Sequence, residues 1–157
     1  DELLLAASTP EKRSGLAEIG GGWITGCPPD GFHAIEIDNL DSYSRSQGLL
    51  SEDNNVAFMR MLSDGAHAEG LAIAQKNSTE LLARAPEMQT DFAVVEECNR
   101  WVECEDYRGV YGDRVFVIEY RQQDFDQGCR DYPGLSIVLR DLDVSTPASA
   151  SYVYDGC

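Results

Sequence analysis

The chain is 157 residues long, with 43% hydrophobic and 25% charged residues, a composition that fits one globular domain with an ample core. Its formal net charge of −16 argues against nucleic acid and anionic membranes as partners, because both would be repelled. The same charge suits a cationic ligand, and it equally suits a solvated acidic surface on a secreted protein.

The predicted elements alternate between strand and helix along the chain. Short apolar runs, expected as buried strands, fill residues 3–6, 32–37, 71–75, 92–95, 115–118 and 135–139. Helices are expected at about 10–27, 54–69, 78–84, 99–111 and 122–131. Thr9 and Pro10 form a good start for the first helix, and Gly70 closes the second. Residues 145–157 are expected to pack as irregular structure.

This order predicts an α/β fold in a single domain spanning residues 1–157, with about six parallel strands and outer helices. A doubly wound sheet would usually carry a glycine-rich first turn, which is not found here. The alternative is a TIM-type (β/α) barrel, whose eight units need about 250 residues. The interpretation is therefore an incomplete barrel without its first two units, which an N-terminal segment or a partner chain would complete.

The cysteines indicate an oxidising compartment. There are five of them and only two histidines, with no CxxC pair, which argues against a zinc site. Cys98 and Cys104 are close enough in sequence to close a small loop, and Cys157 suits a staple at the end of the chain. No signal peptide or transmembrane span is recognised, and the chain begins as if in the middle of a domain.

Polar residues follow the predicted strands, at the ends where β/α folds carry their chemistry. Strand alternation places Asp38 on one side with Glu36, and it gives Lys76, Glu96 and Glu119 as the tips of their own strands. Two carboxylates at nearby tips suit glycoside hydrolysis, with one as nucleophile or base and the other as acid. The same pair suits a divalent metal, and charged residues after a strand are also common at solvated loop starts.

Aromatic residues divide into two groups by their predicted positions. Tyr43 and Tyr120 lie near strand tips, where they suit a platform for a sugar ring. Trp23 and Trp101 lie on predicted outer helices, so both are expected to pack into the core.

Five segments of the chain resemble glycoside hydrolase family 114. Residues 31–43, GFHAIEIDNLDSY, resemble the family's GFDAVEPDNLDSY, and residues 66–77 resemble its AHAKGL…KN. Residues 92–98, FAVVEEC, resemble FAVNEQC, and residues 117–120 and 139–143 resemble the last two strands. The chain departs from the family at Ile37, where members usually carry proline, and at Ala6, where a strand-end aspartate is expected.

The resemblance implies a secreted bacterial TIM-barrel enzyme similar to endo-α-1,4-polygalactosaminidases, without cofactor or metal. The family's catalytic carboxylates fall on Asp38, the expected nucleophile, and Glu96, the expected acid/base, in a retaining mechanism. The predicted substrate-binding residues are Glu36, Asn39, Tyr43, Lys76, Asn77, Glu119, Tyr120 and Asp141. The partner would be a galactosamine polysaccharide, cationic or N-acetylated. The alternative is a non-catalytic carbohydrate-binding or interaction fragment of such a barrel.

Overall fold

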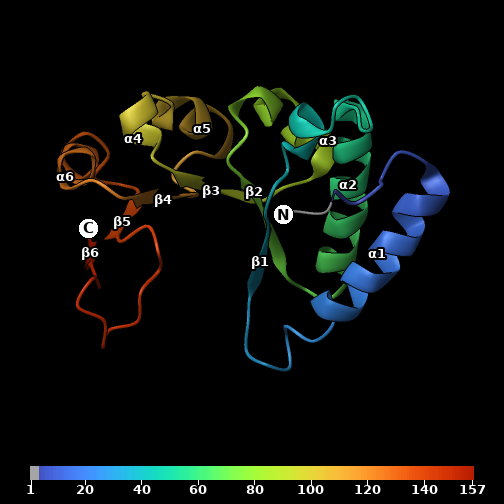
Figure 1. Ribbon diagram of the computed structural model, residues 1–157, viewed down its shortest axis with the longest axis horizontal. Coiled ribbons are helices and arrows are strands. Elements are labelled where there is room, and N and C mark those ends of the chain that lie inside the picture. Colours follow the sequence, from blue (N-terminus) through green and yellow to red (C-terminus); the bar gives the residue numbers. More distant parts are fainter. Residues whose placement is uncertain (1–3) are drawn as a thin grey trace. The chain divides into compact units, whose positions relative to one another are not determined.

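The computed structural model describes residues 4–157, which divide into two compact units, residues 4–91 and residues 92–157 (Figure 1). Each unit combines parallel strands with helices, which confirms the predicted β/α class. Among residues 4–157, no helix is both long enough and apolar enough to cross a membrane.

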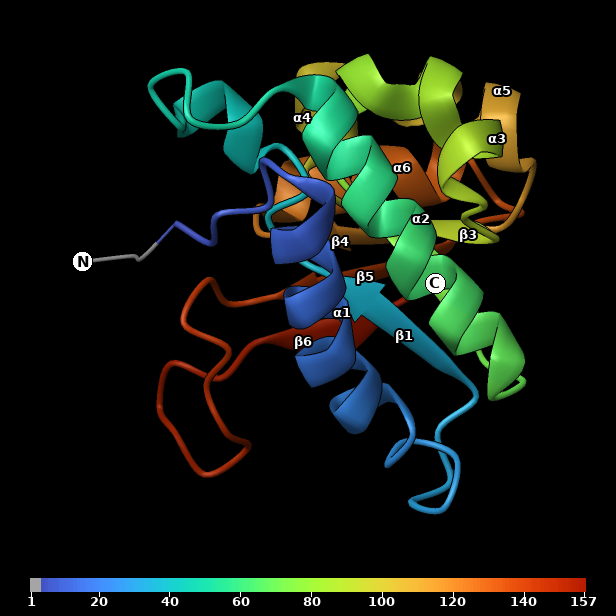
Figure 2. The same ribbon diagram turned by 90° about the vertical axis from the view of Figure 1, so that its right-hand side faces the viewer.

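The first unit is built around two parallel strands and two long helices. In chain order its elements are α1 (Pro10–Ile24), β1 (Ala34–Ile37), the 3-10 helix η1 (Ser42–Arg45), α2 (Glu52–Ala68), β2 (Ala72–Lys76), the 3-10 helix η2 (Thr79–Arg84) and α3 (Ala85–Met88). β1 pairs with β2 in register, with Ala34 opposite Ala72. α1 and α2 lie side by side (Figure 2).

Local sequence explains where the two long helices begin. Thr9 caps α1 with its side chain and Pro10 takes the first helical position, as predicted. α2 starts earlier than expected because Ser51 and Asn54 form a reciprocal capping box. Gly70 has a positive φ of 75° just after α2, which suits a residue without a side chain.

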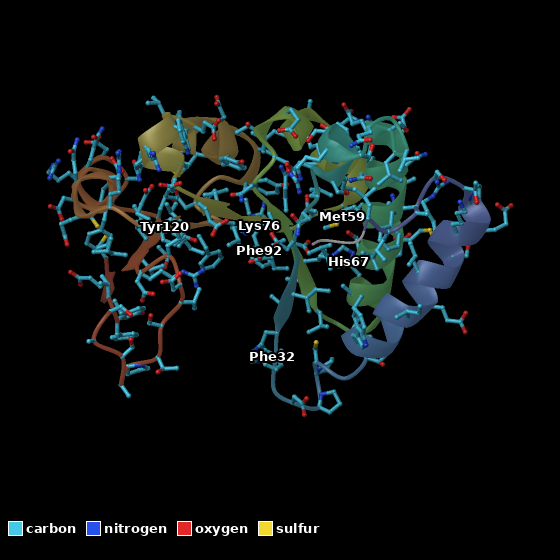
Figure 3. All side chains as sticks on the ribbon, in the orientation of Figure 1. Phe32, Met59, His67, Lys76, Phe92 and Tyr120 are labelled. Carbon is cyan, nitrogen blue, oxygen red and sulfur yellow. A yellow bond between two sulfur atoms is a disulfide. The ribbon has the colours of Figure 1, made fainter. Side chains whose placement is uncertain are left out.

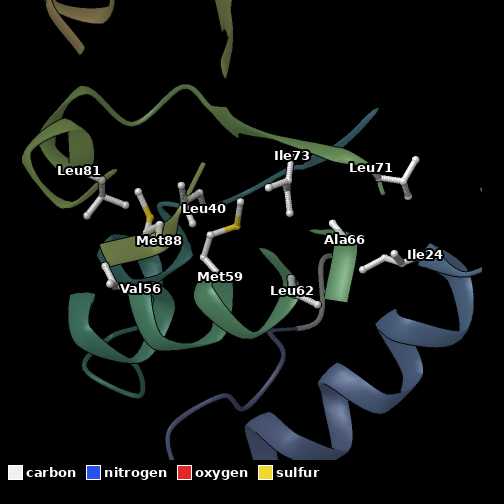
Figure 4. Packing of buried hydrophobic residues seen from close by; sticks show 10 residues of the cluster. All are labelled: Ile24, Leu40, Val56, Met59, Leu62, Ala66, Leu71, Ile73, Leu81 and Met88. Carbon is white, nitrogen blue, oxygen red and sulfur yellow. The ribbon is translucent and has the colours of Figure 1, made fainter. Parts of the chain in front are cut away.

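The core of the first unit is one apolar cluster of α2, the strands and the short helices (Figure 4). Its buried members are Ile24, Leu40, Val56, Met59, Leu62, Ala66, Leu71, Ile73, Leu81 and Met88. Gly20 lets α1 approach closely, because a Cβ at this position would lie 3.1 Å from Cδ2 of Leu62. Ile35 and Ile37 of β1 pack against the same cluster. The opposite face of β1 is therefore left for Glu36 and the residues that follow the strand.

The second unit is a four-stranded sheet with helices. Its elements are β3 (Phe92–Glu96), α4 (Cys98–Trp101), α5 (Cys104–Tyr111), β4 (Val115–Glu119), α6 (Gln122–Asp131), β5 (Ser136–Arg140) and β6 (Tyr154–Gly156). β3, β4 and β5 are parallel, whereas β6 runs antiparallel along β5. A disulfide between Cys129 and Cys157 holds the end of β6 near α6. β6 thus covers the edge of β5 that a closing barrel strand would need.

Several predicted elements need correction. Residues 4–6 form no strand, and residue 3 of that predicted strand lies outside the described residues. The sixth strand is β6, so the prediction of six parallel strands is wrong. The helix predicted at 99–111 is two helices, because Val102 has a φ of 63° and a disulfide joins Cys98 to Cys104. The disulfide Cys98–Cys104 closes the expected small loop, and Cys129–Cys157 ties down the end of the chain as expected. Cys27 is a free thiol.

The tryptophan prediction is wrong for both residues. Trp23 is 76% exposed on α1, and Trp101 is 59% exposed on α4. Both side chains are therefore largely in water, where core packing was expected.

Candidate active site

Asp38 follows β1 directly, and its carboxylate meets the side chain of Lys76 at the end of β2. Nζ of Lys76 lies 3.1 Å from Oδ1 of Asp38 and 3.8 Å from Oε1 of Glu36. The Lys76 side chain is only 10% exposed, because it lies against the strands, whereas Asp38 is open to solvent (Lys76 is labelled in Figure 3). The predicted meeting of Glu36, Asp38 and Lys76 at the strand tips is thus observed in this unit.

The second oxygen of Asp38 is held by Asn39. The Asn39 side chain donates from Nδ2 to Oδ2 of Asp38 at 3.3 Å, and the residue has a left-handed φ of 59° that turns it back toward its neighbour. Oδ1 of Asn39 accepts a hydrogen bond of 2.8 Å from Arg45, whose guanidinium also bonds Asp41. Both oxygens of Asp38 therefore act as acceptors, as in an ionised carboxylate. No sequence pattern had pointed to Arg45, which fixes the orientation of this amide.

A cavity of about 620 Å³ opens beside Asp38 in the first unit. Its walls are mostly apolar side chains of β1, α2 and residues 4–7, while Asp38, Asn39 and Arg45 supply polar groups. An apolar hollow with a few convergent polar groups is the usual form of a small-ligand site.

Tyr43 and Asn77 have defined places near this cluster. The ring of Tyr43 packs against the core, and its hydroxyl donates to Oε1 of Glu80 at 3.3 Å. Burial, followed by the negative charge of Glu80, raises the pKa of Tyr43 to about 12, so the phenol stays neutral. Asn77 has a left-handed φ of 47°, and its backbone carbonyl accepts from Nε2 of Gln75 at 2.9 Å. Sugar binding by both residues stays a prediction.

The second unit carries Glu96 at the end of β3, with Tyr120 beside it. The hydroxyl of Tyr120 donates a hydrogen bond to Oε1 of Glu96 (Tyr120 is labelled in Figure 3). Burial raises the pKa of Tyr120, and the hydrogen bond to Glu96 adds to this effect. The guanidinium carbon of Arg140 lies 5.9 Å from the centre of the Tyr120 ring. Tyr120 therefore links the carboxylate of β3 to a cation of β5, and the sequence had not singled out Arg140.

The strand register decides which side chains share the face of Glu96. Val94 is opposite Phe116, and Glu96 is opposite Ile118, so these residues and Tyr120 lie on one face. Glu119 lies on the other face, which the helices cover. The prediction that Glu119 shares an open tip with Glu96 is therefore wrong. Its neighbour Tyr120 occupies that position.

Glu119 is fully buried beneath α4. Its Oε1 accepts from the backbone N–H of Asn99 at 3.0 Å and from Nδ2 of Asn99 at 3.2 Å. Its Oε2 is buried without a hydrogen-bond partner among residues 4–157. Burial is the largest influence and raises the pKa of Glu119, while the bonds from Asn99 oppose the rise and the charge of Asp124 supports it. With no surface in water, Glu119 holds α4 on the sheet and does not reach a sugar.

Glu119→Gln is expected to change how stability depends on pH. The raised pKa means that the folded chain favours protonated Glu119. This contribution to the free energy of unfolding is complete below the ordinary pKa of 4.5 and is lost as pH rises through the raised value. Urea unfolding of the wild type should show this loss and Glu119→Gln should not, so the variant gains relative stability at higher pH. Glu105→Gln, at an exposed position on α5, is the control, and identical pH profiles for the wild type and Glu119→Gln would refute the assignment.

Asp141 organises the loop before β6. Its Oδ1 accepts from the backbone N–H of Ser145 at 2.9 Å, and its Oδ2 accepts from that of Val153 at 3.3 Å. The bond from Ser145 is the main reason that the pKa of Asp141 is lowered. Both oxygens are thus engaged by backbone groups, and contact between Asp141 and a substrate stays a prediction.

Metal ligation was the second possible use of these carboxylates. Within residues 4–157, no group of three or more histidine, cysteine, aspartate or glutamate side chains is arranged to hold an ion. The two clusters offer carboxylates with hydrogen-bond donors beside them, Asp38 with Lys76 and Asn39, and Glu96 with Tyr120.

The chain is similar in sequence and in fold to known proteins. Residues 1–157 match the model of glycoside-hydrolase family GH114. The chain is similar to the crystal structure of Aspergillus fumigatus Ega3 in complex with galactosamine, at 20% identity and a TM-score of 0.74, covering 96% of this chain and 62% of that one. It is also similar to the glycoside hydrolase domain of PelA from Pseudomonas aeruginosa, at 15% identity and a TM-score of 0.54, covering 94% and 65%.

At these identities the likeness concerns the fold. The chain spans 62% to 65% of the length of these solved chains. No curated protein matches it at a significant level.

Proposed function

The chain belongs to glycoside-hydrolase family GH114, and we propose on that premise that it cleaves α-1,4-linked galactosamine polysaccharide by a retaining mechanism. Asp38 is the nucleophile and Glu96 is the acid/base in this proposal. The observation that carries it is the pair of donors on Asp38, Nζ of Lys76 and Nδ2 of Asn39, which stabilise a carboxylate ready to attack.

The reaction has two steps. Asp38 attacks the anomeric carbon, Glu96 gives its proton to the glycosidic oxygen, and the bond to the leaving sugar breaks. The product of this step is a glycosyl ester on Asp38. Water then attacks the same carbon, Glu96 accepts its proton, and the carboxylate of Asp38 is released. Tyr120 positions the carboxyl group of Glu96 through its hydroxyl in both steps.

The charge of the chain supports a cationic substrate. De-N-acetylated galactosamine polymer carries protonated amines, and a chain with a net charge of −16 attracts it from solution. Glu36 is exposed beside Lys76, and in this proposal it contacts a sugar amine or hydroxyl. The Ega3 structure is a complex with galactosamine, which is consistent with this substrate class.

Two further parts of the proposal concern the context of the chain. Because the chain spans less of the barrel than the solved chains do, we propose that an N-terminal segment or a partner chain supplies the remaining strands. The disulfides Cys98–Cys104 and Cys129–Cys157 support secretion, since such bonds persist in oxidising compartments.

Incubation of the chain with de-N-acetylated α-1,4-galactosaminan is expected to release reducing ends, with less release as salt rises. Fully N-acetylated polymer serves as the control for the amine, and β-1,4-linked glucosamine polymer as a joint control for the linkage and the configuration at C4. Binding of the galactosaminan without any release would favour the alternative of a carbohydrate-binding fragment. The observation behind this alternative is that the chain covers only 62% of the solved Ega3 chain. Release that is equal from all three polymers would contradict the substrate assignment.

A further inference from the structure

Helix α4 carries an exposed tryptophan close to the candidate acid/base residue. Trp101 is 59% exposed, and the next residue, Val102, is 85% exposed. α4 begins at Cys98, with one residue between it and Glu96, so Trp101 lies at the carboxyl end of β3 that bears Glu96. A single exposed apolar side chain is common on protein surfaces. What distinguishes Trp101 is how rigidly it is held.

The backbone around Trp101 is fixed at several points. The disulfide between Cys98 and Cys104 closes the loop that contains it. Glu97 and Val102, on either side of α4, have left-handed φ values of 57° and 63°. This conformation is costly for a β-branched residue such as Val102. Such strain persists only where the surrounding structure enforces it, and it is common at functional sites. The backbone N–H of Asn99 is anchored on buried Glu119.

The indole itself is also oriented. The guanidinium carbon of Arg100 lies 4.7 Å from the centre of the Trp101 ring. Arg100 in turn donates from Nη1 to Oε1 of Glu97 at 2.6 Å. A chain of contacts thus sets the angle of the ring, yet more than half of the residue stays in water. A ring that is already ordered loses little conformational entropy when a ligand covers it.

We propose that Trp101 is an outer subsite that stacks on a galactosamine residue of the polymer, beside the sugar whose bond Glu96 serves. This inference rests on the proposed function and adds a residue to its binding surface. The C–H groups of a pyranose ring match the apolar face of an indole. A protonated sugar amine is further attracted to that face, since tryptophan is the aromatic side chain that binds cations best. The carboxylate of Glu97 pairs with Arg100 and offsets the positive charge of its guanidinium beside the ring.

The test is binding of de-N-acetylated α-1,4-galactosamine oligosaccharides to the whole chain carrying Asp38→Asn, which prevents turnover. Adding Trp101→Ala is expected to raise Kd by about five- to tenfold. Trp23→Ala is the matched control, because Trp23 is the other tryptophan of the chain and is exposed on α1 of the first unit. It is expected to leave Kd unchanged. In a Trp23→Phe background, ligand should move the fluorescence emission of Trp101 to shorter wavelength and protect it from a soluble quencher.

The outcomes separate the subsite from the function. Unchanged Kd in Trp101→Ala, with binding retained, overturns the subsite and leaves the proposed function standing. Equal weakening by Trp101→Ala and Trp23→Ala also overturns it. Trp101→Phe should keep most of the affinity, and if it loses as much as Trp101→Ala the stacking role is wrong. Absence of binding by Asp38→Asn together with absence of cleavage by the wild type contradicts the proposed function and the subsite together.

Discussion

Asp38→Asn is expected to lower turnover of the galactosamine polymer by about a thousandfold or more, with little change in the fold. An amide cannot form the glycosyl ester that the first step requires. The fold is spared because Asp38 is exposed and its contacts are polar ones with Lys76 and Asn39. Reducing-end release measures the loss, and the thermal unfolding midpoint of the variant shows that the chain remains folded.

Asp64→Asn is the matched control, since it makes the same chemical change at an exposed position on α2 paired with Arg60. It should keep full turnover. Azide adds a stereochemical test of the nucleophile with an activated aryl α-galactosaminide. In Asp38→Asn it should attack from the β face in place of the lost carboxylate and give the β-glycosyl azide. Undiminished turnover in Asp38→Asn, or the α-glycosyl azide as product, would show that Asp38 is not the nucleophile.

The side chains at the tips of β1 and β2 were predictable because only one face of each strand could pack on the apolar core. Ile35 and Ile37 are large and apolar, so they pack on the core and leave Glu36 and Asp38 to the other face. A lysine after the small apolar β2 strand then reaches these carboxylates. The hydrogen bond that Arg45 donates to Asn39 depends on the path of the η1 loop, which alternation does not describe.

β4 was ambiguous for the same physical reason. Val115 and Val117 alternate with Phe116 and Ile118, so both faces of the strand are apolar and either can meet the helices. Only the register with β3 shows that the face of Glu96 continues to Tyr120 and not to Glu119. A one-residue change of parity exchanges a buried glutamate for a site tyrosine.

The structures of residues 4–6 and of β6 could not be predicted from local sequence patterns. Leu4 and Leu5 read as a strand, but a strand needs a partner, and both side chains are exposed in the structure. β6 consists of three exposed residues with no apolar alternation. It pairs with β5 through the backbone, and the nearby disulfide joins Cys157 to distant Cys129, a pairing that does not follow from sequence alone.

Glu96→Gln is expected to lower turnover of the polymer by about a hundred- to ten-thousandfold, the usual contribution of a general acid/base. A sugar alkoxide leaves slowly without a proton, whereas an activated aryl group leaves without help. The loss on an activated aryl α-galactosaminide should therefore be much smaller for the first step. Comparison of the two substrates, with Glu105→Gln on α5 as the control for the amide change, measures this difference.

Azide then distinguishes the role of Glu96 from that of Asp38. If Glu96 is the acid/base, Glu96→Gln still forms the ester on Asp38, and azide attacks that intermediate without needing a base. The product should be the α-glycosyl azide, opposite in configuration to the product of Asp38→Asn. Tyr120→Phe removes the hydroxyl that donates to Glu96, so it should lower polymer turnover without permitting azide rescue. The same azide anomer from both carboxylate variants would rule out separate roles for the two residues in a retaining mechanism.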